Sequence, residues 1–515
     1  MKARALAVLG TGSDVGKSVI AAGLCRLLVR AGVRVAPFKA QNMSNNSFVT
    51  RDGKEIGRAQ ALQAQACGLD PHTDMNPILL KPESDRCAQI VVQGKVWGKS
   101  EARDYFRQKA ELAERVRESY ARLVKRYDMI VIEGAGSAAE MNLRDRDLAN
   151  WAMVELADAR VVLVADIDRG GVFAQVIGTL DLFTSEERGR VIGVIINKFR
   201  GDRTLFDDGV KFIEARTGLS VLGVVPMLRD LVIDQEDSVE VERASQEPFD
   251  SAHMNVAVVL LPRMSNFTDF KHLAFEDDVR LRYAADPRDL TGADVVIIPG
   301  SKNTIEDLWA LQRAGFTEAL RRHVASGREL IGICGGFQML GRQIADPDGV
   351  ESGGVVDGLG FLDVSTRMVP AKVTQLVEAQ ALHLDAGTAW AVQGYYIHMG
   401  DTQRGMDHPC FRVCRVDTPS DLLDRSWTDP LDGAVSHDGL IWGTYIHGVF
   451  DQPGFRRAWL NRLRRRNGWE AVRLEASTGV TQRLNGELDR WADHIENHLN
   501  LTRVLNGLHR GRQES

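Results

Sequence analysis

A glycine-rich loop near the N-terminus constrains the fold of this chain more than any other feature. An apolar segment, residues 4–9, leads into the loop 10–18 (GTGSDVGKS), and apolar residues at helical spacing follow it. In the order strand, glycine loop, helix, backbone N–H groups at the helix N-terminus can surround phosphate oxygens. Lys17 could then bridge terminal phosphates, and the Ser18 hydroxyl could bind magnesium. The loop therefore predicts a nucleotide-binding α/β domain.

One position of this loop departs from the usual motif. Strict G-x4-G-K-S spacing would place a glycine at position 11, but the chain has Thr11 there and its first glycine is Gly10. The strand before the loop and the helix after it still favour phosphate binding. The loop residues expected to hold a nucleotide are Gly12, Ser13, Asp14, Val15, Gly16, Lys17 and Ser18.

Continuous apolar segments recur along the first half of the chain. They lie at 33–38, 128–133, 160–166, 190–197 and 220–226, with helix-like segments between them. Such runs are typical of strands buried on both faces of a parallel sheet. Ligands of these sheets gather at the carboxyl ends of the strands. The polar residues at those ends are Lys39, Glu133, Asp166, Asp168, Asn197 and Lys198.

Two of these strand-end residues have a specific predicted role. Glu133 is the expected magnesium carboxylate beside Ser18, because a cation that already holds nucleotide phosphates adds only one or two protein carboxylates. Glu133 could instead cap the turn 134–136. Asn197 could hydrogen-bond a purine, or it could serve as a turn residue.

A long polar insert containing several methionines separates the second and third of the predicted strands. Side-chain amides are dense at 41–47, 57–63 and 75–82, and a second polar cluster, 143–150, follows Glu133. Amide groups suit a large substrate that carries amides and carboxylates, although ordinary loops use them too.

A second strand–turn–helix junction lies in the C-terminal half. New apolar strands are expected at 255–261 and 294–298, then a helix at 305–325, and the run 329–333 ends at Cys334. The helix that follows would direct its N–H groups and dipole at the sulfur and favour the thiolate. We interpret Cys334 as a nucleophile and not as a buried structural cysteine. The glycines after it are expected to supply backbone angles that other residues avoid, and to allow close approach of a substrate carbonyl.

A nucleophile also needs an oxyanion site and a base. Backbone N–H groups of Gly300, Ser301 and Gly335 could stabilise a tetrahedral intermediate on the cysteine. His447 ends an apolar strand and precedes a glycine, and it is the favoured base. His398 has a similar setting and is the alternative.

Composition excludes several other classes of protein. The chain has 515 residues, a net charge of −6 and six cysteines with no paired spacing beyond one C-x3-C, Cys410 and Cys414. The length requires more than one core. The charge gives no reason to expect a nucleic-acid partner, and the cysteines indicate a reducing cytosol and neither disulfides nor a zinc site. No apolar run approaches the length of a membrane span, so no membrane insertion is expected.

The two junctions together resemble those of the glutamine-dependent amidotransferases of cobalamin synthesis. These combine a dethiobiotin-synthetase-like P-loop domain with a class I, triad-type glutamine amidotransferase domain. Within that group the chain is similar to the cobyric acid synthase family over roughly residues 3–500. The similar segments are QNM (41–43), MNP (75–77), DRGGVF (168–173), SNFTD (265–269) and PGSKNT (299–304).

The resemblance implies a function and a domain plan. It implies amidation of the b, d, e and g carboxylates of (adenosyl)cobyrinic acid a,c-diamide through acyl phosphates, with ATP, Mg²⁺ and glutamine, in the cytoplasm. The expected units are an ATP-dependent amidoligase domain (1–235), a linker (236–252), the amidotransferase domain (253–450) and a helical extension (451–515). The extension is expected to carry one apolar helix face, formed by Leu484, Leu488, Trp491, Ile495 and Leu499.

The resemblance also implies residue roles. Cys334 and His447 would act on glutamine, with Gly300, Ser301, Gly335 and Gln338 around the substrate amide. The corrinoid and the phosphates would lie near catalytic Asp147 and near Lys39, Gln41, Asn42, Asn142 and Asn150, and Asn197 would contact the nucleotide.

Two departures and two alternatives accompany this interpretation. Many glutaminases of this class have a third acid two residues beyond the histidine, where this chain has Val449, so the group that orients His447 is unassigned. The family often has the sequence Gly-Tyr-Glu-Ile-His, and in this chain Tyr396 stands in the place of the glutamate. The alternatives are a cobyrinic acid a,c-diamide synthase and a ParA/MinD-like switch ATPase, and the latter usually has an additional early lysine where this chain has Thr11 or Gly12. The oligomeric state is left open.

Overall fold

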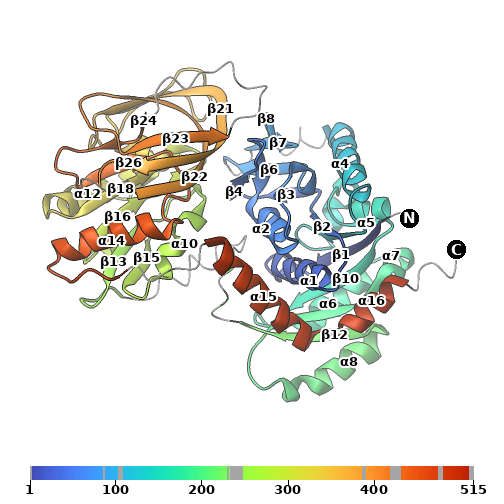
Figure 1. Ribbon diagram of the computed structural model, residues 1–515. Coiled ribbons are helices and arrows are strands. Elements are labelled where there is room, and N and C mark those ends of the chain that lie inside the picture. The colour runs from blue at the N-terminus through green and yellow to red at the C-terminus, as the bar shows by residue number, and fades with distance from the viewer. Residues whose placement is uncertain are drawn as a thin grey trace.

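Two lobes lie side by side in the computed structural model (Figure 1). The structure describes residues 3–84, 87–101, 108–228, 231, 233, 248–384, 390–417, 431–473 and 480–509. The first lobe contains the glycine-rich loop and the second contains Cys334. Most of the predicted linker, 236–252, falls outside the described residues.

A six-stranded, fully parallel sheet forms the centre of the first lobe. Its order is β12-β11-β10-β1-β9-β2. The strands, all close to the predicted runs, are β1 (Arg4–Gly10), β2 (Val35–Phe38), β9 (Met129–Glu133), β10 (Arg160–Asp166), β11 (Val191–Phe199) and β12 (Val221–Pro226). Because β1 is central, the loop that follows it and Glu133 at the end of its neighbour β9 meet at the same edge of the sheet.

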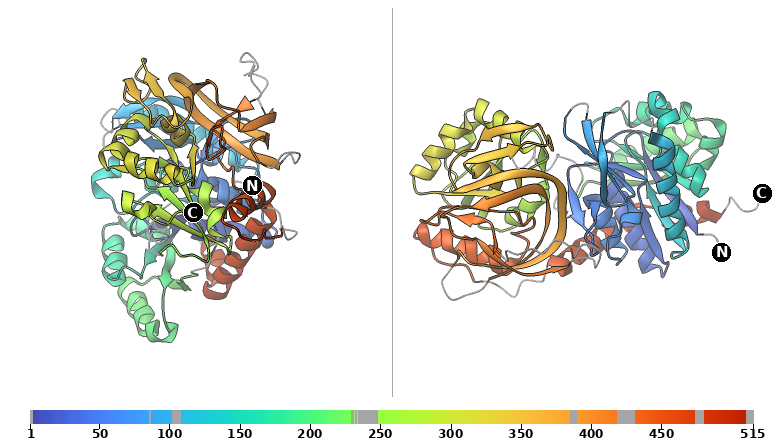
Figure 2. Two further views of the ribbon diagram at one scale, coloured as in Figure 1. Left: turned by 90° about the vertical axis from the view of Figure 1, so that its left-hand side faces the viewer. Right: turned by 90° about the horizontal axis from the view of Figure 1, so that it is seen from above.

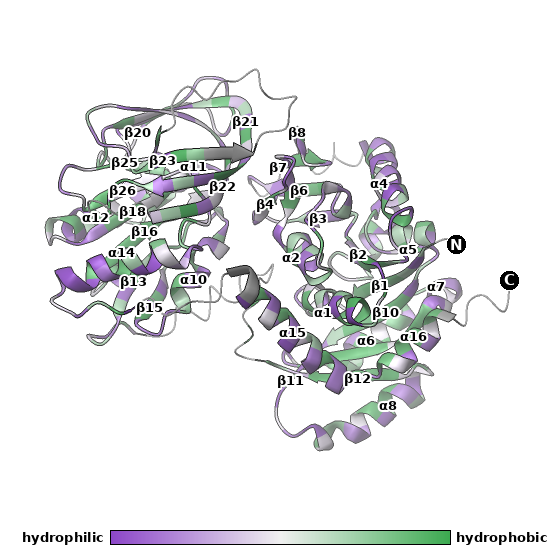
Figure 3. Cartoon of the chain, viewed as in Figure 1, coloured by the Kyte–Doolittle hydropathy of each residue, from purple (hydrophilic) through white to green (hydrophobic). Residues whose placement is uncertain are grey.

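Alternate residues of β1 face two separate hydrophobic cores. Ala5, Ala7 and Leu9 pack with helices α4 (Lys109–Val124), α5 (Trp151–Ala157), α6 (Val172–Asp181) and α8 (Asp207–Thr217). Leu6 and Val8 pack with α1 (Lys17–Arg30) and α2 (Arg58–Ala66) on the other face. Burial on both faces explains why the strands are continuously apolar and not alternating, as the colouring by hydropathy shows (Figure 3).

The polar insert of the first lobe forms strands that face the second lobe (Figure 2). A four-stranded sheet has the order β3-β6-β7-β8, and a hairpin pairs β4 with β5. Their bounds are β3 (Gln41–Met43), β4 (Ser47–Val49), β5 (Glu55–Gly57), β6 (Ile78–Pro82), β7 (Cys87–Val92) and β8 (Lys95–Glu101). The insert therefore lies between the nucleotide-binding edge and the second lobe.

The second lobe is built on another mainly parallel sheet, in the order β15-β13-β16-β18-β26-β25. Only the short edge strand β25 runs antiparallel. The strands are β13 (Met254–Val259), β15 (Val279–Ala284), β16 (Val295–Ile298), β18 (Glu329–Ile333), β25 (Ala434–Val435) and β26 (Ile441–Thr444). The single helix predicted at 305–325 is two helices, α11 (Thr304–Arg313) and α12 (Phe316–Ala325), because Gly315 interrupts it in a left-handed conformation with φ of 86°.

A mixed sheet, antiparallel except for the parallel pairing of its strands β19 and β21, covers one side of this lobe. Its order is β20-β19-β21-β23-β24, with β22 paired to β21. The bounds are β19 (Gln343–Asp346), β20 (Gly354–Asp357), β21 (Val364–Ala381), β22 (Trp390–Arg404), β23 (Phe411–Asp417) and β24 (Leu431–Asp432). Strand β22 places the carbonyl oxygen of Ile397 3.7 Å from the Cys334 sulfur.

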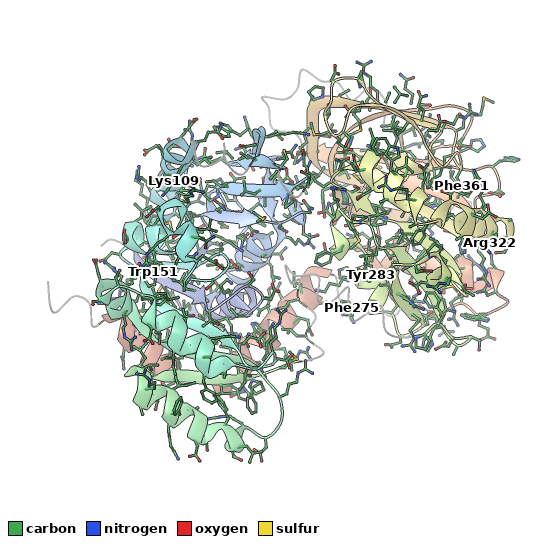
Figure 4. All side chains as sticks on the ribbon, turned by 180° about the vertical axis from the view of Figure 1, so that it is seen from behind. Lys109, Trp151, Phe275, Tyr283, Arg322 and Phe361 are labelled. Carbon is green, nitrogen blue, oxygen red and sulfur yellow. The ribbon has the colours of Figure 1, made fainter. Side chains whose placement is uncertain are left out.

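The C-terminal helices serve both lobes. Helix α14 (Pro453–Arg466) packs on the second lobe, whereas α15 (Val480–His498) and α16 (Leu501–His509) return to the first. The predicted apolar face of α15 is confirmed, since Leu488, Trp491 and Ile495 are buried against α1 and its neighbours. At its start, Arg483 stands over the ring of Phe275, on the side of the second lobe that faces the first (Figure 4).

Among the described residues, no helix combines the length and apolar character that a membrane span requires.

Candidate functional site

The glycine-rich loop holds its shape through Gly16 and Asn197. Gly16 precedes α1 with φ of 92°, a conformation that favours glycine. The Asn197 side chain, from the end of β11, donates to the Val15 carbonyl at 2.9 Å and would collide with any β-carbon at Gly16. Asn197 thus fixes the loop itself, a role beyond the purine contact and the turn position expected from the sequence.

Lys17 and Ser18 turn toward the end of β9. Lys17 Nζ donates to the carbonyl oxygens of Gly12 and Gly136, at 2.9 and 2.8 Å. Ser18 Oγ donates to Glu133 Oε1 at 2.6 Å. The loop and the strand-end carboxylate thus form one polar group at the sheet edge.

Glu133 is buried in a ring of donors. Besides Ser18, its carboxylate accepts from Lys39 at 2.9 Å and from Gln63 at 2.6 Å. Burial alone would raise the pKa of Glu133, but the Lys39 charge and the hydrogen bonds lower it. An ionised carboxylate beside a hydroxyl is an all-oxygen donor set of the kind that Mg²⁺ prefers, so Ser18 and Glu133 fit the predicted metal.

A cavity of about 1060 Å³ opens over this group. It lies between the glycine-rich loop, the strands of the insert and the segment after β9. Of the residues predicted for nucleotide, metal or substrate, those that line it are Ser13, Asp14, Gly16, Lys17, Ser18, Lys39, Gln41, Asn42, Glu133, Asp147, Asn150 and Asn197. Gly12 and Val15 shape the loop beneath the cavity without lining it, and Asn142 is exposed and also lies outside the lining.

Asp147 and Asn150 fix the segment that borders the cavity. The Asp147 carboxylate accepts from the backbone N–H groups of Ala149 and Asn150, at 3.0 and 2.9 Å. The Asn150 side chain donates to the Ala135 carbonyl at 2.8 Å and accepts from its N–H at 3.1 Å. These bonds tie the start of α5 to the turn after β9.

Cys334 occupies a strained turn between β18 and α13 (Gly335–Leu340). Its φ and ψ are 51° and −107°, which an L-residue adopts only under constraint from its surroundings. The expectation that the following glycines supply the special angles is wrong, because neither has a positive φ. They are needed for space: a β-carbon at Gly336 would overlap the Ile298 carbonyl, and one at Gly335 would lie 2.9 Å from Ser301 N.

His447 is paired with an acid from a distant segment. Its Nδ1 lies 2.7 Å from Asp269 Oδ2, and Asp269 Oδ1 accepts from Gly448 N at 3.1 Å. Burial alone would lower the pKa of His447, but the charges of Asp269 and of the Cys334 sulfur, both of which also hydrogen-bond the ring, raise it to about 10. Asp269 is thus the orienting group that the sequence analysis left unassigned, whereas Val449 is a buried apolar residue. In the sequence, the only indication of a role for Asp269 was its position at the end of the SNFTD motif (265–269).

The alternative base, His398, lies in a different environment. Its Nδ1 is 2.9 Å from the Gly400 carbonyl, and its ring stacks on Tyr445 with centroids 3.9 Å apart. Burial lowers its pKa to about 3. His398 is therefore neutral at physiological pH, with a carbonyl and not a carboxylate at Nδ1.

The predicted oxyanion residues meet beside Cys334. Ser301 and Gly300 form β17 (Gly300–Ser301), which pairs with β14 (Met264–Ser265). A β-carbon at Gly300 would come within 3.1 Å of His447 Cε1, so the glycine leaves room for the ring. Gln338 is buried and bonded at both ends, accepting from Thr304 Oγ1 and donating to Tyr445 Oη, each at 3.0 Å.

Comparison with known proteins assigns both lobes. Residues 6–239 match the family model of the CobQ/CobB/MinD/ParA nucleotide binding domain, and residues 255–455 match that of the CobB/CobQ-like glutamine amidotransferase domain. The chain is 47% identical to the cobyric acid synthase of Syntrophobacter fumaroxidans, over 98% of each chain. The chain belongs to the cobyric acid synthase family. The Pelotomaculum thermopropionicum member is 48% identical over 98% of this chain and 96% of its own, and the Citrobacter koseri member is 46% identical over 97% of each.

Membership of the cobyric acid synthase family sets the class of reaction. The chain is a glutamine-hydrolysing carbon–nitrogen ligase of cobalamin biosynthesis that uses ATP in its nucleotide-binding domain. The match to relatives over nearly the whole chain, glutaminase domain included, decides against a switch ATPase built from the first domain alone.

Proposed function

We propose that this protein amidates the b, d, e and g carboxylates of (adenosyl)cobyrinic acid a,c-diamide, with ATP, Mg²⁺ and glutamine. The observation that carries the proposal is the presence of two complementary sites in one chain. One is the Cys334–His447–Asp269 group, and the other is the cavity over Lys17 and Glu133. The volume of this cavity, about 1060 Å³, lies just above the usual range for small-molecule sites, which suits a nucleotide beside a large second substrate.

In the second lobe the cysteine would release ammonia from glutamine. Cys334 Sγ attacks the side-chain amide carbon, and the oxyanion forms near the backbone of Ser301 and Gly335. His447, held by Asp269, delivers its proton to the departing ammonia. Water then hydrolyses the glutamyl thioester and regenerates the thiol.

In the first lobe a substrate carboxylate would attack the γ-phosphoryl group of ATP. The product is an acyl phosphate, from which ammonia displaces phosphate to form the amide. Lys17 neutralises charge that develops on the transferred group. Ser18 and Glu133 would hold Mg²⁺, which when bound supplies further neutralisation of that charge. We assign Asp147 to the catalytic group at the carboxylate, with Lys39, Gln41, Asn42 and Asn150 binding substrate around it and Asn142 at the outer margin.

Two variants test this division of labour. Cys334→Ala is expected to lose glutamine-dependent amidation and to retain amidation driven by added ammonium salt. Lys17→Ala is expected to lose both, because the acyl phosphate no longer forms. Full glutamine-dependent activity in Cys334→Ala would exclude the glutaminase assignment, and ammonia-driven activity in Lys17→Ala would exclude the role in ATP use.

Product mass distinguishes the proposed substrate from its nearest alternative. A cobyric acid synthase adds four amides to cobyrinic acid a,c-diamide. A cobyrinic acid a,c-diamide synthase amidates two other carboxylates and would leave this substrate unchanged. Mass spectrometry of the products after incubation with ATP and glutamine therefore decides between them.

A further inference from the structure

A strand of the first lobe reaches the glutaminase residues of the second. The β4 segment crosses between the lobes, where Ser47 N donates to Asn266 Oδ1 at 3.0 Å. Beside it, Asn46 Oδ1 accepts from Phe267 N at 3.2 Å. All four residues are buried, so these two bonds are shielded from water.

The Asn266 side chain has contacts at both of its ends. Its oxygen is held by Ser47, and its nitrogen lies 3.3 Å from each ring nitrogen of His447. Asn266 is only 2% exposed and has φ of 53°, a conformation in which asparagine is enriched. One amide therefore connects the backbone of the first lobe to the imidazole of the second.

A second contact follows the same direction. Phe48 of β4 packs on Tyr395, with ring centroids 6.0 Å apart. Tyr395 in turn stacks on His447 at 5.3 Å, with its plane 18° from that of the imidazole. The imidazole thus has Asn266 as a polar neighbour and Tyr395 as an aromatic one, and both are held by β4.

The other end of this hairpin is bonded to the nucleotide edge. Gly57 N, at the end of β5, donates to Asn76 Oδ1 at 3.2 Å. Asn76 Nδ2 donates to the Lys39 carbonyl at 3.1 Å, and Lys39 Nζ pairs with Glu133. Buried hydrogen bonds therefore extend from the proposed magnesium carboxylate through the hairpin toward His447.

We propose that Asn266 is a positioning residue through which strand β4 of the first lobe holds His447 against Cys334. Glutamine hydrolysis then requires the docked hairpin and is not a property of the second lobe alone. This inference rests on the proposed glutaminase role of Cys334 and adds to it a residue that acts through His447.

The test compares substitutions on both sides of the interface. Asn46→Ala removes the acceptor for Phe267 N, and Asn46→Asp keeps an acceptor oxygen at the same place. Asn266→Gly removes the amide but tolerates the positive φ. Lys99→Met is the matched control: it breaks the inter-lobe contact of Lys99 with the Val350 carbonyl and the ion pair of Lys99 with Glu83, and none of these residues belongs to either proposed site.

Misplacement of a catalytic group by about 1 Å is enough to slow a reaction by about 100-fold, so a smaller displacement still has a measurable effect. We therefore expect Asn46→Ala and Asn266→Gly to lower kcat for glutamine hydrolysis by at least about tenfold, with KM for glutamine within about twofold. Asn46→Asp should recover most of kcat, and Lys99→Met should keep it. Ammonia-driven amidation should persist in all four, which shows that the first lobe is folded and active.

Each outcome bears on one of the two proposals. Wild-type kcat in both Asn46→Ala and Asn266→Gly, with an inactive Cys334→Ala, would overturn the positioning role and leave the glutaminase assignment intact. An active Cys334→Ala would instead remove the glutaminase assignment itself. If Asn46→Ala also lost ammonia-driven activity through misfolding, the other two variants would still test the proposal. If Asn46→Asp hydrolysed glutamine as slowly as Asn266→Gly, the result would contradict the role of the acceptor oxygen of Asn46.

Discussion

At the scale of residues, the glutaminase site depends on a charge brought from far along the chain. Asp269 lies 178 positions before His447 in the sequence, yet its carboxylate is 2.7 Å from the ring. It fixes which imidazole nitrogen faces the cysteine and stabilises the imidazolium, the same two functions that an aspartate has in a Ser-His-Asp triad. The substitution Asp269→Asn separates these functions from simple packing, because the two side chains have nearly the same shape.

We expect Asp269→Asn to lower kcat for glutamine hydrolysis by about 100-fold or more, with ammonia-driven amidation unchanged. Because Asp269 and the Cys334 sulfur raise the pKa of His447 to about 10, the wild-type imidazolium persists below that pH and loses its proton above it. The alkaline loss of activity should therefore move to lower pH in Asp269→Asn. Steady-state pH profiles measure both effects, and an unchanged profile would argue against the pairing.

The residues at strand ends could be predicted from the sequence, whereas Asp269 could not. Glu133 ends the apolar strand β9, Cys334 follows β18 directly, and Lys17 and Ser18 begin the helix after the glycine-rich loop, so their place at a sheet edge follows from the local pattern. The segment before Asp269 contains only the two-residue strand β14, and no local pattern says which distant residue it meets. The motif pointed to the segment, but only the fold pairs it with His447.

At the scale of elements, the late helix α15 completes a domain made at the other end of the chain. Trp491 Nε1 donates to the Val19 carbonyl in the first turn of α1 at 2.7 Å, and Arg26 of α1 pairs with Asp489 at 2.7 Å. Trp491 also borders the nucleotide cavity. The helical period predicted an apolar face on α15, but it could not show which lobe that face covers.

Trp491→Ala should destabilise the first lobe by about 3–5 kcal/mol, the usual cost of removing a large buried side chain. The affinity for ATP should fall as well, because the N-terminal turn of α1 loses a hydrogen bond and a packing partner. Denaturant unfolding with and without ATP measures both. Trp309→Ala, at an exposed site on α11 of the second lobe, is the control and should change neither quantity appreciably.

At the scale of the whole molecule, a buried group of charges joins the lobes. Glu55 of β5 pairs with Lys81 of its own lobe and with Lys372 from β21 of the other. All three side chains are nearly inaccessible to solvent. Burial lowers the pKa of Lys372 to about 7, although Glu55 opposes that change.

Glu55→Gln leaves two buried lysines without their carboxylate and should weaken the docked state by about 3–5 kcal/mol. Guanidinium denaturation of this variant should show the lobes unfolding in separate transitions. Lys81→Met should weaken the docked state less than Glu55→Gln does, because the ion pair of Glu55 with Lys372 remains. Equal stability of the Glu55→Gln variant and the wild type would show that the cluster does not hold the lobes together.

The same cluster predicts a pH dependence of stability. Between pH of about 7 and 10.5 the unfolded chain binds a proton at Lys372 that the folded chain does not, so the contribution of Lys372 to the free energy of unfolding should rise with pH across that window. The raised pKa of His447 acts in the opposite direction up to a pH of about 10, so the difference between the wild type and Lys372→Met isolates the lysine. Lys372→Met should lose this contribution, and its free energy of unfolding should fall relative to that of the wild type as the pH increases. Lys211→Met, an exposed lysine of α8, should leave the contribution of Lys372 in place. Urea unfolding at a series of pH values provides the measurement.

The return of α15 to the first lobe has a consequence for how the protein is made. Leu6 and Val8 of the central strand share a core with Leu488 and Ile495, which the ribosome adds only after the second lobe. Part of the first sheet therefore stays uncovered while the entire second lobe is synthesised and folds. A transcript cut short before α15 would yield a protein with both sets of reactive residues but an exposed apolar face, which makes it a substrate for chaperones or proteases.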